Sequence, residues 1–204
     1  SFKQCVRECV RALNEVLDEG MPLHPLEEQR ESVRDWRQIG LGIMGLADML
    51  IKMGIPYGDQ DSQELCDRIG FAMADTAIAA SAMMAKEQGM FPKCSINAIM
   101  DTPYFEANTS APTKELVKKY GLHNSQLLTI APTGTLSTML GISGGIEPVF
   151  ANYYVRKTES LHGKDVYYKV YTKIVDTYMK DHKLTDDSML PDYFVTAMTL
   201  DYRQ

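Results

Sequence analysis

The feature that most constrains the fold is an apolar stretch at residues 71–85, which only Asp75, Thr76 and Ser81 interrupt. The stretch lies within a helix predicted over residues 61–88. Asp61 and Glu64 are spaced like a capping box at its start, and Gly89 follows its end. Because a helix that is apolar on all sides must be enclosed, other elements have to surround it. We expect a chain of 204 residues to cover it incompletely.

Apolar periodicity and turn residues predict the other elements. Helices are expected at residues 2–19, 26–37, 39–52, 113–120 and 166–179, with a last short helix starting near Pro191, and residues 93–113 are expected to form a loop. Residues 126–131 form a short apolar run typical of a buried parallel strand, and residues 149–155 are expected to be extended. One strong strand among many helices is unusual for a complete domain. We therefore expect residues 1–204 to be part of a larger α/β domain.

The composition indicates which classes of binding partner are unfavourable for this chain. The 21 basic and 27 acidic residues give a net charge of −6, which disfavours a nucleic-acid-binding function. The sequence contains no secretory signal and no apolar window long enough to span a membrane, so a cytoplasmic protein is expected. The four cysteines and four histidines have no metal-site spacing, and the cysteines are interpreted as small apolar residues of helices. The tyrosines around residues 153–171 could form a nucleic-acid stacking surface, but their apparent helical spacing favours packing.

Two glycine-containing motifs invite a nucleotide-binding interpretation. Residues 40–45 match the dinucleotide pattern Gly-x-Gly-x-x-Gly, but no hydrophobic strand precedes them, and close backbone approach explains these glycines better. The segment Pro132, Thr133, Gly134, Thr135, Leu136 and Ser137 directly follows the predicted strand and leads into a helix start. Backbone N–H groups at such a helix start favour anions, and the hydroxyl groups can add hydrogen bonds. The alternative is an ordinary strand-to-helix turn capped by threonines.

A second loop follows shortly after this segment. Gly144 and Gly145 indicate positive φ angles or a close approach, and Glu147 is held extended because Pro148 follows it. By itself this pattern indicates only a constrained loop.

Together these motifs resemble the large, catalytic subunit of ribonucleotide reductase. The resemblance is carried by residues 124–137 (Asn-Ser-Gln-Leu-Leu-Thr-Ile-Ala-Pro-Thr-Gly-Thr-Leu-Ser) and 141–151 (Gly-Ile-Ser-Gly-Gly-Ile-Glu-Pro-Val-Phe-Ala), with residues 37–48 and 85–89 matching upstream. It implies a segment of a ten-stranded α/β barrel in which residues 132–137 bind the substrate phosphates and Gly144, Gly145, Glu147 and Pro148 shape the neighbouring loop. The residues of these motifs are most similar to the adenosylcobalamin-dependent class, and the two-subunit aerobic class is a near neighbour.

The resemblance also implies what the parent enzyme does. It would reduce ribonucleotides to deoxyribonucleotides by thiyl-radical chemistry, as an oligomer supplied by a dithiol reductant such as thioredoxin. The family's Asn-x-Cys-x-Glu motif is not present in these 204 residues, so no catalytic residue and no cofactor ligand is assigned here, and the chain alone is expected to be inactive. A non-catalytic phosphate- or nucleotide-binding module derived from the same fold is the alternative.

Overall fold

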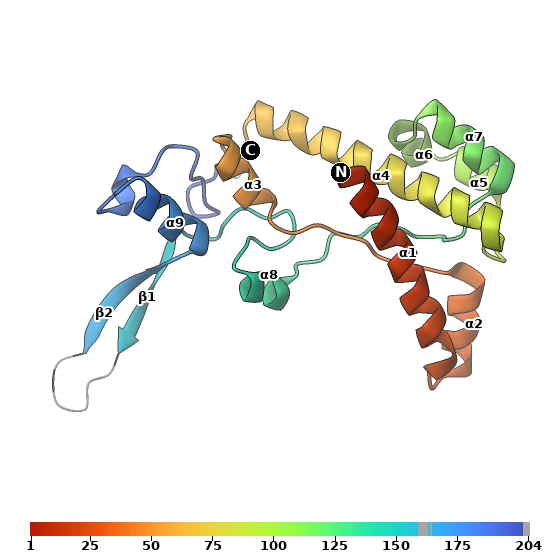
Figure 1. The fold of residues 1–204 in the computed structure, drawn as a ribbon, viewed down its shortest axis with the longest axis horizontal. Helices are drawn as coiled ribbons and strands as arrows, with labels where there is room; N and C mark the ends of the chain where they lie inside the picture. The colour runs from red at the N-terminus through yellow and green to blue at the C-terminus, as the bar shows by residue number, and fades with distance from the viewer. Residues whose placement is uncertain (159–162, 164, 202–204) are drawn as a thin grey trace. The chain divides into compact units, whose positions relative to one another are not determined.

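The computed structural model describes residues 1–158, 163 and 165–201, and Figure 1 shows their secondary structure. The chain divides into two compact units. Unit 1 comprises Ser1–Gly42 and Cys66–Thr129, and unit 2 comprises Ile43–Leu65 and Ile130–Gln204. Of the histidines considered above, His162 lies outside the described residues, as do the last three residues of the expected 1–204 segment.

The regular elements described in unit 1 are all helices. They are α1 (Phe2–Gly20), a 3₁₀ turn η1 (Met21–Leu23), α2 (Glu27–Trp36), α5 (Ile96–Met100), α6 (Pro103–Asn108), α7 (Ala111–Tyr120) and most of α4 (Gln60–Gln88), which begins in unit 2. The predictions for α1, α2, α4 and α7 are confirmed to within two residues. The loop predicted at 93–113 is wrong in part, because Ser95 and Thr102 accept hydrogen bonds from Ala98 N and Phe105 N and so cap two short helices.

Helix α4 is covered incompletely, as the sequence predicts, since Phe71 is 41% exposed and Ala72, Ala79 and Met83 are only partly buried. Its side chains from Met73 to Ile78 are all buried, as is Ala82. Val6 and Val10 of α1 are buried in the same unit, and Val117 of α7 is fully buried. The expected start of α4 is also corrected: Asp59, rather than Asp61, caps the helix by accepting a 2.8 Å hydrogen bond from Ser62 N.

The first part of the helix predicted at 39–52 and the strand predicted at 126–131 are replaced by one short parallel pairing, while the rest of that helix forms α3 (Leu46–Met53). Residues 39–45 are not helical, and Ile39 N and Leu41 N donate to the carbonyl oxygens of Gln126 and Leu127 at 3.0 and 2.8 Å. The strand expected at 126–131 is reduced to a single bridge between Leu41 and Leu128. Its predicted burial is also wrong at Ile130, which is 53% exposed, because the described residues pair with this segment only near Leu41.

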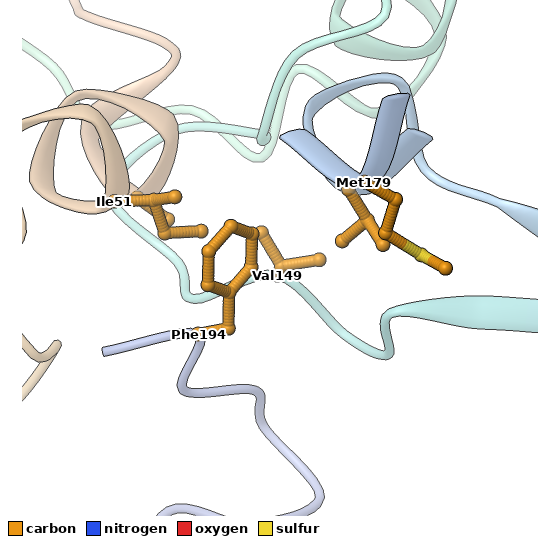
Figure 2. Close-up of a cluster of buried hydrophobic side chains, with 6 residues drawn as sticks. Ile51, Val149, Met179 and Phe194 are labelled. Atoms are coloured by element: carbon orange, nitrogen blue, oxygen red, sulfur yellow. The ribbon is translucent and has the colours of Figure 1, made fainter. Parts of the chain in front are cut away.

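Unit 2 contains α3 (Leu46–Met53), α8 (Gly134–Leu140), β1 (Tyr153–Thr158), β2 (Val166–Tyr171), α9 (Lys173–Asp181) and a 3₁₀ turn η2 (Asp187–Met189). Its core is a buried cluster to which α3 contributes Ile51, α9 contributes Met179, and the segments outside the helices contribute Val149 and Phe194 (Figure 2). Instead of the helix expected near Pro191, a turn is closed by a hydrogen bond from Phe194 N to Pro191 O.

Strands β1 and β2 form an antiparallel hairpin in which Tyr153 pairs with Tyr171 and Thr158 with Val166 (Figure 1). The helix predicted over 166–179 is therefore wrong in its first half. The β-branched and aromatic residues of 166–171 fit a pleated strand, and the helix starts only after the extended Thr172. The interpretation that the tyrosines pack against other residues is also wrong for Tyr154, Tyr167 and Tyr168, which are exposed on the hairpin.

Candidate functional site

The candidate site is built around the start of α8. Ser137 N donates the first hydrogen bond of this helix to Thr133 O at 2.8 Å. The preceding N–H groups of Gly134, Thr135 and Leu136 therefore have no intrahelical acceptor. All three residues are exposed, as is Pro132. The positive end of the helix is thus presented to the surface at the segment that the sequence predicts to bind phosphate.

Thr133 is the residue that fixes the entry into α8. Its φ of 50° and ψ of 28° lie in the left-handed region, which β-branched residues rarely adopt. The Thr133 hydroxyl does not cap α8; its Oγ1 instead accepts a 3.0 Å hydrogen bond from Gly145 N. A contact twelve residues along the chain therefore holds the loop in an uncommon conformation.

The predicted loop-shaping glycines lie directly against this segment. A Cβ atom added to Gly144 would be 2.7 Å from Pro132 O, and one added to Gly145 would be 2.9 Å from Ala131 O. Gly145 also has a positive φ of 47°. Any other side chain at either position would push the backbone of residues 131–132 away, so glycine is needed for this close approach.

The hydroxyl groups of the site are not equivalent. Ser137 is buried and its Oγ donates to Gly134 O at 3.2 Å, while Thr138 Oγ1 donates to the same carbonyl at 2.7 Å. Thr135 is exposed beside the free N–H groups. Thr135 is therefore the hydroxyl best placed to meet a ligand, whereas Ser137 supports the turn from within.

A cavity of about 570 Å³ lies beside this segment, entirely within unit 2. Its lining includes Pro132, Gly134, Ser137, Gly144, Glu147 and Pro148 from the predicted site. Sequence reasoning missed Asp48 and Lys173, which line it as well. A signal for Asp48 was present, since it is the carboxylate that interrupts the apolar segment beginning at Ile39. No comparable signal marked Lys173.

Asp48 has a structural role at the wall of this cavity. It is 7% exposed, and its Oδ2 accepts a 2.5 Å hydrogen bond from Ser143 N, while Ser143 O accepts one from Gly45 N at 2.9 Å. These bonds tie the loop containing Gly144 and Gly145 to the start of α3. Glu147 closes the same loop by donating its N–H to Gly144 O at 3.1 Å.

The charges around the cavity favour one position for an anion. Asp48 and Glu147 are carboxylates, so a phosphate would be repelled from their side. The start of α8 offers N–H groups, and Lys173 supplies a cationic side chain whose stem lies over Gly141 at the other end of that helix. The arrangement can hold an anionic group at residues 134–136.

The glycines at 40–45 lack the strand that a dinucleotide-binding motif requires before it. Helix α2, rather than a strand, precedes them, and a Cβ atom on Gly42 would lie 2.5 Å from Thr129 O. A Cβ atom on Gly40 would lie 2.8 Å from Thr129 Cγ2. The interpretation as points of close backbone approach is confirmed at Gly42, whereas the close neighbour of Gly40 is a side-chain atom.

The four cysteines are free thiols, and all of them belong to unit 1. Over residues 1–158, 163 and 165–201, no three or more His, Cys, Asp or Glu side chains are grouped so that they could hold a metal ion. In the same part of the chain, every helix is too short or too polar to cross a membrane.

Comparison with known proteins identifies the family of this chain. The family model described as "Ribonucleotide reductase, barrel domain" matches residues 1–202. The chain belongs to the ribonucleotide reductase barrel family. The resemblance predicted from the motifs at 124–137 and 141–151 is confirmed.

Relatives in this family include reductases named as vitamin B12-dependent and reductases whose names do not mention vitamin B12. The Vitamin B12-dependent ribonucleoside-diphosphate reductase of Thermoplasma acidophilum is 35% identical over 165 residues, covering 81% of this chain and 19% of that protein. The protein of the same name from Mycobacterium tuberculosis is 35% identical over 153 residues, covering 75% and 19%. The Ribonucleoside-diphosphate reductase subunit alpha of Chlamydia pneumoniae is 29% identical over 182 residues, covering 78% and 17%. This chain thus spans about a fifth of the length of these relatives.

Proposed function

We propose that this chain is a segment of the catalytic barrel of a ribonucleotide reductase and that it supplies the loop that binds the substrate phosphates. The observation that carries the proposal is the start of α8, where three exposed N–H groups follow a left-handed Thr133 held by Gly145. The family match over residues 1–202 supports the assignment to the barrel. In this proposal the segment contributes to a ten-stranded α/β barrel whose other strands belong to the remainder of the reductase chain.

The loop would bind phosphate mainly through its backbone. Partial positive charge accumulates on the N–H groups of the first turn, so a phosphate oxygen placed there gains several charge-assisted hydrogen bonds. Gly134 has no Cβ and leaves open space at this turn, since no atom lies within 4 Å of where a Cβ would stand. The Thr135 hydroxyl can donate one further bond, while Gly144, Gly145, Glu147 and Pro148 hold the loop in shape.

The reaction proposed for the parent enzyme is replacement of the ribose 2′-hydroxyl by hydrogen through thiyl-radical chemistry. In the class suggested by the B12-dependent relatives, adenosylcobalamin would supply the radical and a dithiol such as thioredoxin the reducing equivalents. We assign no residue of this chain to that cofactor and none to hydrogen abstraction. Its own residues bind and orient the nucleotide by its phosphates in a cytoplasmic, oligomeric enzyme.

Substitution of the two threonines tests the phosphate-binding role. In the intact reductase, T135A should weaken ribonucleotide affinity about tenfold or more, because a hydrogen bond to a charged group contributes about 1.5–3 kcal/mol. T133A should weaken it as well, since the loop loses its bond to Gly145 N. Isothermal titration with a ribonucleoside diphosphate measures both effects.

A matched control is T185A, because Thr185 is an exposed threonine of unit 2 that lies outside residues 132–137. Its affinity should equal that of the unmodified enzyme. If T133A and T135A also left affinity unchanged, residues 132–137 would not be the phosphate-binding segment.

A further inference from the structure

Two side chains hold the loop of residues 141–148, which we call the glycine loop, from another part of unit 2. Asp48 Oδ2 accepts the 2.5 Å hydrogen bond from Ser143 N, and Tyr57 OH donates to Ile146 O at 2.7 Å. Both side chains are themselves anchored, because Asp48 is buried within α3 and the Tyr57 ring packs against the core cluster shown in Figure 2. The glycine loop is therefore fixed at two points, one on each side of its paired glycines.

The glycine loop in turn fixes the start of α8. Gly145 N donates to Thr133 Oγ1 at 3.0 Å, and Gly144 approaches so closely that a Cβ atom there would be 2.7 Å from Pro132 O. Thr133 has the left-handed φ of 50°. Because β-branched residues rarely adopt this conformation, it persists only where surrounding contacts hold it. A displacement of the glycine loop would therefore release Thr133 and reorient the N–H groups that follow it.

We propose that Asp48 and Tyr57 are positioning residues for phosphate binding. They act through the glycine loop, by keeping Thr133 in its left-handed conformation and the N–H groups of residues 134–136 directed toward the ligand. This positioning role rests on the proposed function, because it requires that these N–H groups bind the substrate phosphates.

The sign of the effect separates positioning by Asp48 from direct electrostatics. Asp48 lines the cavity, and its negative charge opposes the approach of a phosphate. If charge were its only influence, removal of the carboxylate would tighten phosphate binding. Positioning predicts the opposite for D48A, because alanine leaves Ser143 N without its acceptor and frees the glycine loop. Asparagine retains an oxygen atom that can accept this hydrogen bond, so D48N should restore the affinity that D48A loses.

The experiment measures the affinity of the intact reductase for a ribonucleoside diphosphate by isothermal titration and, by competition, for pyrophosphate, which has no ribose or base. We expect D48A to weaken both by about tenfold, the factor that corresponds to one hydrogen bond to a charged acceptor. D48N should bind within about threefold of the unmodified enzyme. Y57F should weaken both by about threefold, because it removes only the neutral bond to Ile146 O. Tighter binding by D48A would overturn the positioning role.

D75A and Y193F are matched controls. Asp75 is 9% exposed and accepts a 2.8 Å hydrogen bond from Ser110 N, so D75A removes the same kind of bond in unit 1. Tyr193 packs against the same core cluster as Tyr57, and its OH donates to Tyr178 OH at 3.0 Å, so Y193F removes a phenol bond outside the glycine loop. Both controls should lower the urea unfolding midpoint and leave both affinities unchanged.

Comparison with T135A separates a failure of the positioning role from a failure of the proposed function. If T135A weakened binding and both D48A and Y57F did not, the positioning role would be refuted and the proposed phosphate-binding segment would stand. If T135A also left the affinities unchanged, both would fail. A loss of affinity in D75A equal to that in D48A would show general destabilisation and would overturn the positioning role. Should D48A not fold, Y57F decides the question, because it keeps the aromatic ring and removes one oxygen atom.

Discussion

Asn124 is fully buried in unit 1, and both ends of its amide are hydrogen-bonded. Its Nδ2 donates to Asn14 Oδ1 at 2.8 Å and to Arg37 O at 2.9 Å, while its Oδ1 accepts from Ser81 Oγ at 3.1 Å. Because an unsatisfied buried amide costs about 1–3 kcal/mol, these bonds fix the mutual positions of α1, α4 and the segment after α7. The network explains why Ser81, which interrupts the apolar stretch of α4, is 0% exposed.

The neighbouring His123 is a buried titratable group whose neutral form the fold selects. It is 4% exposed, and its Nδ1 lies 2.7 Å from Gly89 O. Burial lowers its pKa from the usual 6.5, and the positive charge of Arg37 acts in the same direction. The bond to Gly89 and the charge of Asp18 oppose this shift without cancelling it.

The lowered pKa of His123 predicts that the free energy of unfolding decreases in mild acid. Above about pH 6.5 the ring is neutral in both states, so the free energy of unfolding contains the full contribution of His123. As the pH falls below 6.5 the unfolded chain binds a proton that the folded chain does not, and stability decreases by at most about 1.4 kcal/mol per pH unit. Urea unfolding between pH 7.5 and 5.0 measures the slope. H123Q should flatten it and H182Q, at an exposed position, should not; an equal slope in H123Q would refute the assignment.

Among the elements, the parallel pairing of residues 39–41 with 126–129 depends on glycine. G42A should destabilise unit 1 by about 2 kcal/mol or more, because its Cβ would lie 2.5 Å from Thr129 O, a backbone atom that cannot rotate away. G70A is the matched control: Gly70 is an exposed position within α4 with open space around it, so alanine should stabilise the helix by about 0.5–1 kcal/mol. The urea unfolding midpoints of both variants, measured by circular dichroism, test these two expectations. A G42A variant as stable as the original chain would contradict the close approach.

The elements that the sequence predicts well are indicated by patterns of apolar residues within the elements themselves. Helix α4 has a long uninterrupted pattern, and α1 has an apolar stripe that ends near Gly20. The strand β2 is different, because Val166, Val170 and Ile174 have helical spacing even though the first two lie in a strand. The pairing with β1 decides its conformation, and that partner is not visible in a local window.

At the candidate site too, features set by neighbouring residues could be predicted, whereas tertiary contacts could not. The helix start at 132–137 could be predicted, since glycine and hydroxyl residues at a helix start are local features. The bond from Gly145 N to Thr133 Oγ1 and the presence of Lys173 in the cavity depend on tertiary contacts. For that reason the sequence also could not separate the exposed Thr135 from Ser137, whose hydroxyl is bonded to Gly134 O.

For the molecule as a whole, the candidate site and the thiols belong to different units. The segment proposed to bind phosphate and the cavity beside it lie in unit 2, whereas Cys5, Cys9, Cys66 and Cys94 all lie in unit 1. None of these cysteines stands in an Asn-x-Cys-x-Glu sequence. In the proposed reaction a cysteine radical must touch the ribose of a nucleotide held by its phosphates, and no cysteine of this chain is assigned that place.

We therefore predict that the isolated 204-residue chain binds a ribonucleotide but does not reduce it. The chain would be supplied with a ribonucleoside diphosphate, adenosylcobalamin and a dithiol, and deoxyribonucleotide would be measured by chromatography. No product above a protein-free blank is expected, while nucleotide binding should be detectable and should weaken in T135A. Restoring the remainder of the reductase chain should restore turnover, because it would bring the radical cysteine to the ribose. Product formed by the isolated chain would show that one of its four cysteines performs the chemistry, and single serine variants at these positions would then identify it.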